Sequence, residues 1–167
     1  MKIYALLSLI LISVFSFSQN KEQTFDQMVK SYYKGTIPLI YPHQLYKKML
    51  SKEKIYILDT REKKEFEVST IKNAIHVGYE QFSMERVKSI NKNAPIIVYC
   101  TIGARSENIG EKLKKNGFTN VSNLYGGLIY WKNQNYKVIH ANKNTTPNIH
   151  VFSKEWGKWL KKGIAVY

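Results

Sequence analysis

Residues 95–106 read PIIVYCTIGARS, an apolar segment that ends on the only cysteine of the chain before turning polar. A short run of isoleucine and valine after a proline is typical of a buried β-strand. Residues 106–113 have helical spacing, and residues 114–117 carry the Lys, Asn and Gly signals that end a helix. We therefore expect the thiol of Cys100 to lie where a strand turns into a helix.

This position favours a reactive thiolate. A loop between a strand and a helix points main-chain N–H groups at one place, and the helix N-terminus adds partial positive charge. Both favour the thiolate, which is the nucleophilic form of cysteine. The alternative is an inert buried cysteine, which the loop of residues 100–105 argues against. Arg105 adds a cation that either contacts an anionic substrate or braces the loop.

Residues 1–18 form a separate segment. Lys2 precedes an apolar run over residues 6–17 that is broken only by serines, and small residues follow at residues 16–18. This pattern predicts a secretory signal peptide and therefore a periplasmic or secreted protein. The alternative, an uncleaved membrane anchor, is disfavoured by the shortness of the run, so we expect no stable membrane insertion after cleavage.

Composition narrows the classes of partner. The 167 residues contain 26 Lys and Arg against 12 Asp and Glu, a formal charge of +14. Because the lysines are scattered, this charge favours solubility and attraction of small anions, and we expect no nucleic-acid binding. A single cysteine cannot form an internal disulfide, and a free thiol in an exported protein is open to oxidation.

Short apolar strands alternate with helical patterns along the rest of the chain. Strands are expected at residues 37–40, 54–59, 74–79, 95–100 and 121–125. Helices are expected at residues 21–34, 42–50, 81–90 and 106–115, with a short one carrying Leu128, Ile129 and Trp131. The alternation predicts an α/β fold with a five-stranded parallel sheet and helices on both faces. Ligands of such sheets bind beyond the carboxyl ends of the strands, where Asp59, Cys100 and Gly126-Gly127 fall.

The polar residues after the second strand have two interpretations. Asp59, followed by Arg61 and Glu65, indicates a buried polar network, with a general acid as the alternative. Arg61 and Glu65 have the i,i+4 spacing of a helical ion pair. We expect His43 to lie on the surface and His76 to be a sheet residue rather than a catalytic base.

The two ends are expected to pack on the domain. Residues 19–36 predict an N-terminal helix whose apolar stripe faces the core; the stripe is Phe25, Met28, Val29, Tyr32 and Tyr33. Residues 133–149 are polar and predict a surface loop. The Trp-rich tail within residues 135–167 predicts a helix capped by Ser153 that presents Trp156 and Trp159. These tryptophans either pack on the domain or bind a protein partner.

Residues 37–134 resemble a rhodanese-like (sulfurtransferase homology) domain of the single-domain, exported bacterial type. Four segments carry the resemblance in order: residues 58–61 with Glu65-Phe66, residues 71–74, residues 99–106, and residues 124–127 with Trp131. The chain departs from the family pattern at Thr70, Lys72 and Asn73, where His, Pro and Gly are usual. We expect those changes to affect stability modestly and the chemistry little.

The resemblance implies sulfur transfer through a persulfide on the catalytic Cys100. An anionic donor such as thiosulfate supplies the sulfur, a thiol or cyanide accepts it, and no metal or organic cofactor takes part. The resemblance assigns substrate binding to Thr101, Ile102, Gly103, Ala104, Arg105 and Ser106. It assigns support of the site to Asp59, Arg61, Glu65, Gly126 and Gly127.

Two other functions remain open. Phosphatases and arsenate reductases with a similar loop place five residues between Cys and Arg, whereas four separate Cys100 from Arg105. The shorter loop narrows the ring, so that a sulfur atom fits better than a tetrahedral phosphate. The second alternative is a non-enzymatic module that carries sulfur, senses redox state or binds a partner.

Overall fold

The computed structural model describes residues 23–51 and 53–167, so the predicted signal peptide lies outside the described residues. Five parallel strands form one sheet in the order β1-β5-β4-β2-β3, which confirms the predicted architecture. The strands are β1 (Leu39–Ile40), β2 (Tyr56–Asp59), β3 (Ala74–His76), β4 (Ile96–Tyr99) and β5 (Val121–Leu124).

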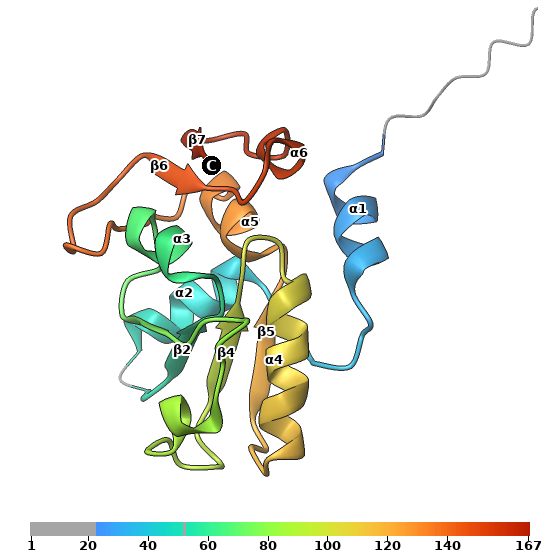
Figure 1. Ribbon diagram of the computed structural model, residues 1–167, viewed down its shortest axis with the longest axis vertical. Coiled ribbons are helices and arrows are strands. Elements are labelled where there is room, and N and C mark those ends of the chain that lie inside the picture. Colours follow the sequence, from blue (N-terminus) through green and yellow to red (C-terminus); the bar gives the residue numbers. More distant parts are fainter. Residues whose placement is uncertain (1–22, 52) are drawn as a thin grey trace, which may run out of the picture.

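Helices cover both faces of the sheet, because successive side chains of a strand point to opposite faces. Ile57 and Ile97 belong to one buried cluster with residues of α1, α2 and α5, and Leu58 and Val98 belong to a second cluster with residues of α4. Figure 1 shows α4 running alongside β4 and β5. The helices are α1 (Phe25–Tyr32), α2 (Pro42–Leu50), α3 (Lys63–Val68), α4 (Ala104–Lys115) and α5 (Gly127–Asn133).

Local sequence explains where the helices begin. Thr24 and Gln27 form a reciprocal capping box at the start of α1, and Pro42 is the first residue of α2. Gly103 precedes α4 with φ of 106°, a left-handed conformation that glycine adopts without strain. Since α4 begins at Ala104, Arg105 lies in its first turn rather than in the preceding loop.

One predicted helix is wrong. Residues 81–90 contain only a short 3₁₀ turn, η1 (Met84–Val87). The backbone of Ser83 is extended, with φ of −133° and ψ of 153°, so no helix begins before Met84. The predicted third strand is also shorter than expected, because β3 ends at His76.

Residues 133–149 are more than a surface loop. Val138 is fully buried, and Ile139 forms isolated antiparallel bridges with Thr70 and Thr145. A second, two-stranded parallel sheet follows, made of β6 (Asn148–His150) and β7 (Ile164–Val166). The segment therefore packs against the main domain at Thr70 before the chain enters this small sheet.

The C-terminal tail packs beside the N-terminal helix. Its helix α6 (Lys154–Gly157) is shorter than expected, and the Ser153 hydroxyl donates to the Glu155 carboxylate instead of capping the helix. The ring of Trp156 lies 5.1 Å from that of Tyr32, and the ring of Trp159 lies 5.8 Å from that of Phe25. Both ends of the described chain thus share one side of the molecule.

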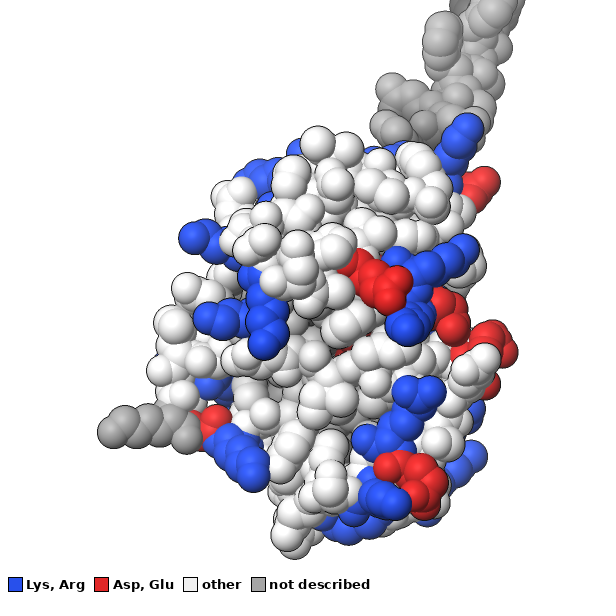
Figure 2. Space-filling view, turned by 60° about the vertical axis from the view of Figure 1, so that its left-hand side comes forward, with Lys and Arg blue, Asp and Glu red and all other residues white. Residues whose placement is uncertain are grey.

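The face of the molecule seen in Figure 2 carries charged side chains of both signs. Figure 2 shows Lys and Arg side chains spread across one face, with Asp and Glu among them. Within residues 23–51 and 53–167, no helix has the length and apolar character needed to cross a membrane.

Candidate active site

Cys100 follows β4 directly, and 1 % of its surface is exposed. The N–H of Gly103 donates to the Cys100 Sγ across 3.1 Å. The sequence predicts several such donors, whereas among the described residues this is the one main-chain N–H that bonds to the sulfur. The first turn of α4 begins immediately afterwards and leaves N–H groups without intrahelical acceptors.

A polar cluster fixes the end of the loop. The carbonyl of Gly103 accepts from the Asn123 amide across 2.9 Å and lies 3.0 Å from the Ser106 hydroxyl. The Ser106 Oγ also lies 2.7 Å from the Asn123 Oδ1. All three residues are buried, so these contacts tie the start of α4 to β5 in a water-poor environment.

The Gly126-Gly127 segment supports the other side of the loop. The N–H groups of Leu128 and Ile129 donate to the carbonyls of Cys100 and Thr101 across 2.9 and 3.1 Å. Gly127 has φ of 55°, and a Cβ at this position would lie 2.6 Å from the Thr101 carbonyl carbon. Only glycine permits this close approach of α5 to the loop of residues 100–103.

Arg105 pairs with Glu65. Both of its terminal nitrogens bond to the Glu65 carboxylate, and Nη2 also donates to the Thr101 hydroxyl across 3.0 Å. Of the two predicted roles of Arg105, these contacts favour the brace. Burial alone would raise the pKa of Glu65, but the Arg105 hydrogen bond and charge outweigh it and hold the pKa below its usual value.

The predicted pair between Arg61 and Glu65 is wrong. Arg61 instead binds Asp59 through Nε at 3.0 Å and Nη2 at 2.7 Å, and all atoms of this pair are buried. The counterion of the buried Asp59 carboxylate is therefore Arg61, and Glu65 pairs with Arg105 instead. In the described part of the chain, the Arg61 Nη1 is the one buried side-chain nitrogen or oxygen that has no hydrogen-bond partner.

Tyr99 links the Asp59 network to the residue before the cysteine. Its hydroxyl donates to the Asp59 carboxylate across 2.5 Å and accepts from the N–H of Ile71 across 3.1 Å. Burial, together with the neighbouring Asp59 charge, raises the pKa of Tyr99 well above its usual value, so the hydroxyl stays protonated. Asp59 is fully buried beneath these donors, which is the arrangement of a structural carboxylate.

Side chains from both ends of the chain flank the loop. Tyr33, directly after α1, donates to the carbonyl of Ile102 across 2.8 Å. Phe152, from the C-terminal tail, lies over the Arg105 guanidinium at 4.8 Å. In Figure 1 the connection between β4 and α4 points toward this tail.

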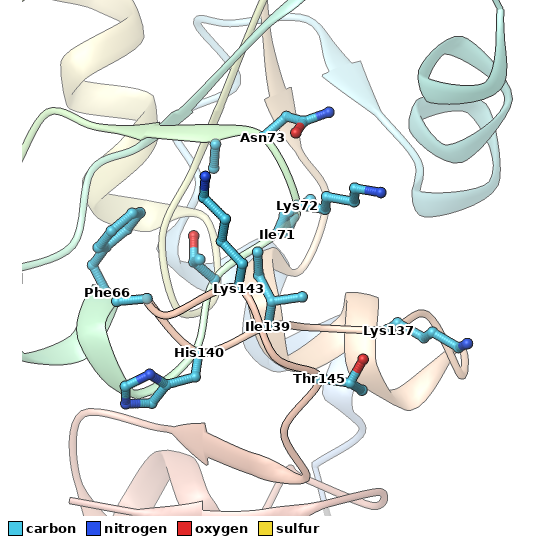
Figure 3. A pocket seen from close by; sticks show the side chains of 12 residues that line it. Phe66, Ile71, Lys72, Asn73, Lys137, Ile139, His140, Lys143 and Thr145 are labelled. Atoms are coloured by element: carbon cyan, nitrogen blue, oxygen red, sulfur yellow. The ribbon is translucent and has the colours of Figure 1, made fainter.

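A pocket of about 500 Å³ lies between residues 66–74 and 137–145. Figure 3 shows Lys143 extending across it above Ile139. Thr70 and Ile71 line the pocket and also contact the Tyr99 hydroxyl, but the lining contains none of residues 100–106. Across the described residues, no group of three His, Cys, Asp or Glu side chains is placed to hold a metal ion.

The structure brings most of the predicted residues to one place, and it adds others. Cys100, Arg105, Glu65 and Gly127 surround the loop, whereas Asp59 and Arg61 lie beneath it. Sequence reasoning assigned Tyr33 to an apolar stripe, and it missed Tyr99 and Asn123. It also missed Glu107, whose carboxylate accepts from the N–H groups of Lys34 and Thr36 just after Tyr33. Asn123 had a usable signal, since a polar residue within a buried strand requires a hydrogen-bond partner.

The two histidines considered in the sequence lie as expected. His43 is exposed, and the His76 ring, at the end of β3, bonds to the Arg61 carbonyl at 2.9 Å.

Comparison with known proteins gives a consistent family. The sequence profile of the rhodanese-like domain family matches residues 42–134, more than half of the chain. The chain is 32 % identical over 96 residues to the thiosulfate sulfurtransferase GlpE of Coxiella burnetii, covering 58 % of this chain and 88 % of that protein. It is 33 % identical over 97 residues to YrkF of Bacillus subtilis, which is named as a candidate sulfur carrier protein; the match covers 58 % of this chain and 52 % of YrkF.

Solved structures agree with the fold. The solution structure of the rhodanese-like domain from the Anabaena protein Alr3790 superposes with a TM-score of 0.57 at 25 % identity. The superposition covers 62 % of this chain and 79 % of that one.

Proposed function

The chain belongs to the rhodanese-like domain family, and from that premise we propose that it is a sulfurtransferase in which Cys100 carries the transferred sulfur. The observation that supports this most directly is the Gly103 N–H donor aimed at the Cys100 Sγ. A hydrogen bond of this kind stabilises negative charge on the Cys100 Sγ, both in the attacking thiolate and in the thiolate that is released when the transferred sulfur leaves.

The first half-reaction forms the persulfide. The Cys100 thiolate attacks the outer sulfur of an anionic donor such as thiosulfate, a sulfur–sulfur bond forms, and sulfite leaves with the electron pair of the broken bond. The negative charge now lies on the terminal sulfur of Cys100. We expect the N–H groups in the first turn of α4, which lack intrahelical acceptors, to stabilise this charge.

The second half-reaction returns the thiolate. A nucleophile, either a thiol or cyanide, attacks the terminal sulfur and takes it, and the electron pair of the broken bond stays on Cys100. Because Cys100 is 1 % exposed, both substrates reach the sulfur only after side chains around the loop move. Phe152, which is 53 % exposed and lies over the Arg105 guanidinium, is one of the side chains beside the loop.

Arg105 acts in this scheme mainly through the loop. Its guanidinium is committed to Glu65 and Thr101, and 20 % of its side chain remains exposed. An anionic donor that bound this cation would compete with a buried carboxylate. We therefore assign Arg105 to bracing the loop, with a secondary electrostatic attraction on the donor.

We extend the proposal to location. The pattern of residues 1–18 supports export to the periplasm or the medium, where a small-molecule donor and a thiol acceptor would meet the mature domain. Mass measurement of the protein recovered from its native compartment tests this. A mass that lacks residues 1–18 supports it, and a full-length mass contradicts it.

A thiosulfate:cyanide assay tests the enzyme. Wild-type protein should release thiocyanate and sulfite, and Cys100→Ser should release neither while keeping its thermal stability. Incubation with thiosulfate alone should add one sulfur atom to the intact mass of the wild type and none to that of the variant. Absence of both the persulfide and the turnover would reject the proposal.

A second function remains because one relative is named as a candidate sulfur carrier. A carrier would form the same persulfide on Cys100 but would pass its sulfur to a dedicated protein. The two functions separate in the same experiment: a stable persulfide with negligible turnover to cyanide or small thiols supports the carrier.

A further inference from the structure

The Ile102–Gly103 peptide links the catalytic sulfur to a residue outside the family match. The Gly103 N–H of this peptide donates to the Cys100 Sγ across 3.1 Å, and the Ile102 carbonyl of the same peptide accepts from the Tyr33 hydroxyl across 2.8 Å. A trans peptide is planar, and its C=O and N–H groups point in opposite directions. A hydroxyl that holds the carbonyl therefore also aims the N–H at the sulfur.

Because Gly103 has no side chain, hydrogen bonds rather than backbone sterics determine the orientation of the Ile102–Gly103 peptide. Gly103 has φ of 106°, and glycine accepts either sign of φ at little cost, so rotation of the preceding peptide is accessible. The Tyr33 ring fills the space beside Gly103, where the ring carbon Cζ would lie 2.6 Å from a Cβ. The ring thus closes one side of the loop, and the hydroxyl selects the direction of the peptide.

Tyr33 is itself fixed as a donor. Its hydroxyl oxygen accepts from the N–H of Gly126 across 2.9 Å, which leaves the hydroxyl proton for the Ile102 carbonyl. Burial raises the pKa of Tyr33, so the proton stays in place at any physiological pH. Hydrogen bonds in such a chain polarise one another, which strengthens the final bond to sulfur.

We propose that Tyr33 is a positioning residue for the catalytic cysteine: its hydroxyl orients the Ile102–Gly103 peptide so that the Gly103 N–H stabilises negative charge on Cys100. The rhodanese-like match covers residues 42–134, so a segment that precedes the family domain completes its active site. The inference rests on the proposed function for its effect on sulfur transfer, but its effect on the thiol itself can be measured without that function.

The test compares Tyr33→Phe with Tyr32→Phe. Tyr33→Phe keeps the ring beside Gly103 and removes only the hydroxyl, whereas Tyr32 is 51 % exposed and its neighbouring ring belongs to Trp156. We expect Tyr33→Phe to slow alkylation of Cys100 by iodoacetamide about tenfold at neutral pH, less than the roughly 100-fold or more lost when a donor to a reacting anion is itself removed, because the Gly103 N–H remains and only its orientation is freed. Its pH–rate profile should move to higher pH than that of the wild type, and Tyr32→Phe should follow the wild type.

Two further measurements separate positioning from general stability. The Gly103 amide should exchange its hydrogen faster in Tyr33→Phe, because its orientation toward sulfur is no longer fixed. In the thiosulfate:cyanide assay, kcat should fall while the KM for thiosulfate changes little. Both readouts are compared at temperatures well below the unfolding midpoint of each variant.

Several outcomes would overturn the inference. Alkylation at the wild-type rate with an unmoved pH profile would show that the hydroxyl does not act on the sulfur. A uniform loss at every pH, accompanied by a lower unfolding temperature and unchanged Gly103 exchange, would show a merely structural role. If neither protein transfers sulfur but the alkylation profiles differ as expected, the proposed function fails while the positioning role of Tyr33 stands.

Discussion

Arg105 and Glu65 form a two-point ion pair beside the loop of residues 100–103. Arg105 Nη1 lies 2.8 Å from Glu65 Oε2, and Nη2 lies 2.8 Å from Oε1. The pair joins α3 to the first turn of α4, and the Glu65 carboxylate is fully buried. Because a bidentate geometry fixes orientation as well as distance, the pair holds the residues after Cys100 in one arrangement.

Arg105→Ala should therefore destabilise the protein. The substitution leaves the Glu65 carboxylate buried without its cation, and loss of one partner of a buried pair costs about 3 kcal/mol. We expect kcat for sulfur transfer to fall with the loop order, while the KM for thiosulfate changes little. Urea unfolding and steady-state kinetics measure the two effects.

Arg86→Ala is the matched control, because Arg86 is exposed and lies in η1. Its effect on the free energy of unfolding should stay within about 0.5 kcal/mol. A large rise in the KM for thiosulfate of Arg105→Ala, with a weaker dependence on salt and unchanged stability, would contradict the bracing role. That result would assign Arg105 to direct contact with the donor.

Glu65 should also govern part of the acid sensitivity. Although burial opposes ionisation, its hydrogen bonds with Arg105 and the charges of Arg105 and Arg61 lower its pKa below the usual value of about 4.5. A carboxylate with a lowered folded-state pKa adds stability that is fully present above about 4.5 and is lost as the pH falls through the folded-state value. The free energy of unfolding should thus decline in this acidic range.

Comparison with Glu65→Gln isolates this contribution, since the other carboxylates are common to both proteins. The variant should be less stable than the wild type at neutral pH, and the difference should shrink as the pH falls below about 4.5. Parallel curves from pH 7 to pH 3 would show that Glu65 is not the titrating group.

The sheet could be predicted because its signals are local. Apolar runs such as residues 96–99 specify buried strands, and helical spacing between them specifies parallel crossovers. The helix expected at residues 81–90 failed because the apolar residues there pack from a short turn, which spacing alone does not distinguish from a helix. The sequence therefore predicts which segments form strands better than it predicts where each helix or strand begins and ends.

The partners within the site could not be predicted, because they come from segments far apart in sequence. Arg61 and Glu65 have the spacing of a helical ion pair. In the structure, however, Arg61 pairs with Asp59, and Glu65 pairs with Arg105. Tyr33 has the spacing of a core residue, and only the fold shows its hydroxyl at the Ile102 carbonyl. Sequence periodicity predicts on which face of a helix or strand a residue lies, but it does not predict the polar atom to which that residue forms a hydrogen bond.

Glu107 should be essential for holding the N-terminal segment in place. Its carboxylate, 2 % exposed, accepts from the N–H groups of Lys34 and Thr36 across 2.9 and 2.8 Å. Glu107→Ala leaves both donors unpaired and should cost about 2 kcal/mol. Because Tyr33 precedes Lys34, alkylation of Cys100 should slow as it does in Tyr33→Phe.

Glu111→Ala is the control for this prediction. Glu111 lies one turn further along α4 and contacts the side chains of Thr36 and Lys34 rather than their N–H groups. Its removal should leave the alkylation rate unchanged and lower stability less than Glu107→Ala does. Equal alkylation rates in Glu107→Ala and the wild type would show that the segment keeps Tyr33 in place by other contacts.

Gly127→Ala should displace the backbone of residues 100–102, against which Gly127 packs. The new Cβ would lie 2.6 Å from the Thr101 carbonyl carbon and 2.7 Å from the Ile102 nitrogen, and the residue has φ of 55°. Overpacking and left-handed strain together should cost about 3 kcal/mol or more, and sulfur transfer should be lost as the loop shifts. Gly117→Ala shares the strain, with φ of 87°, but its Cβ meets no atom within 4 Å, so it should cost only about 1 kcal/mol and keep its activity. Similar losses of stability and activity in the two variants would show that strain, rather than contact with the loop, makes glycine necessary at Gly127.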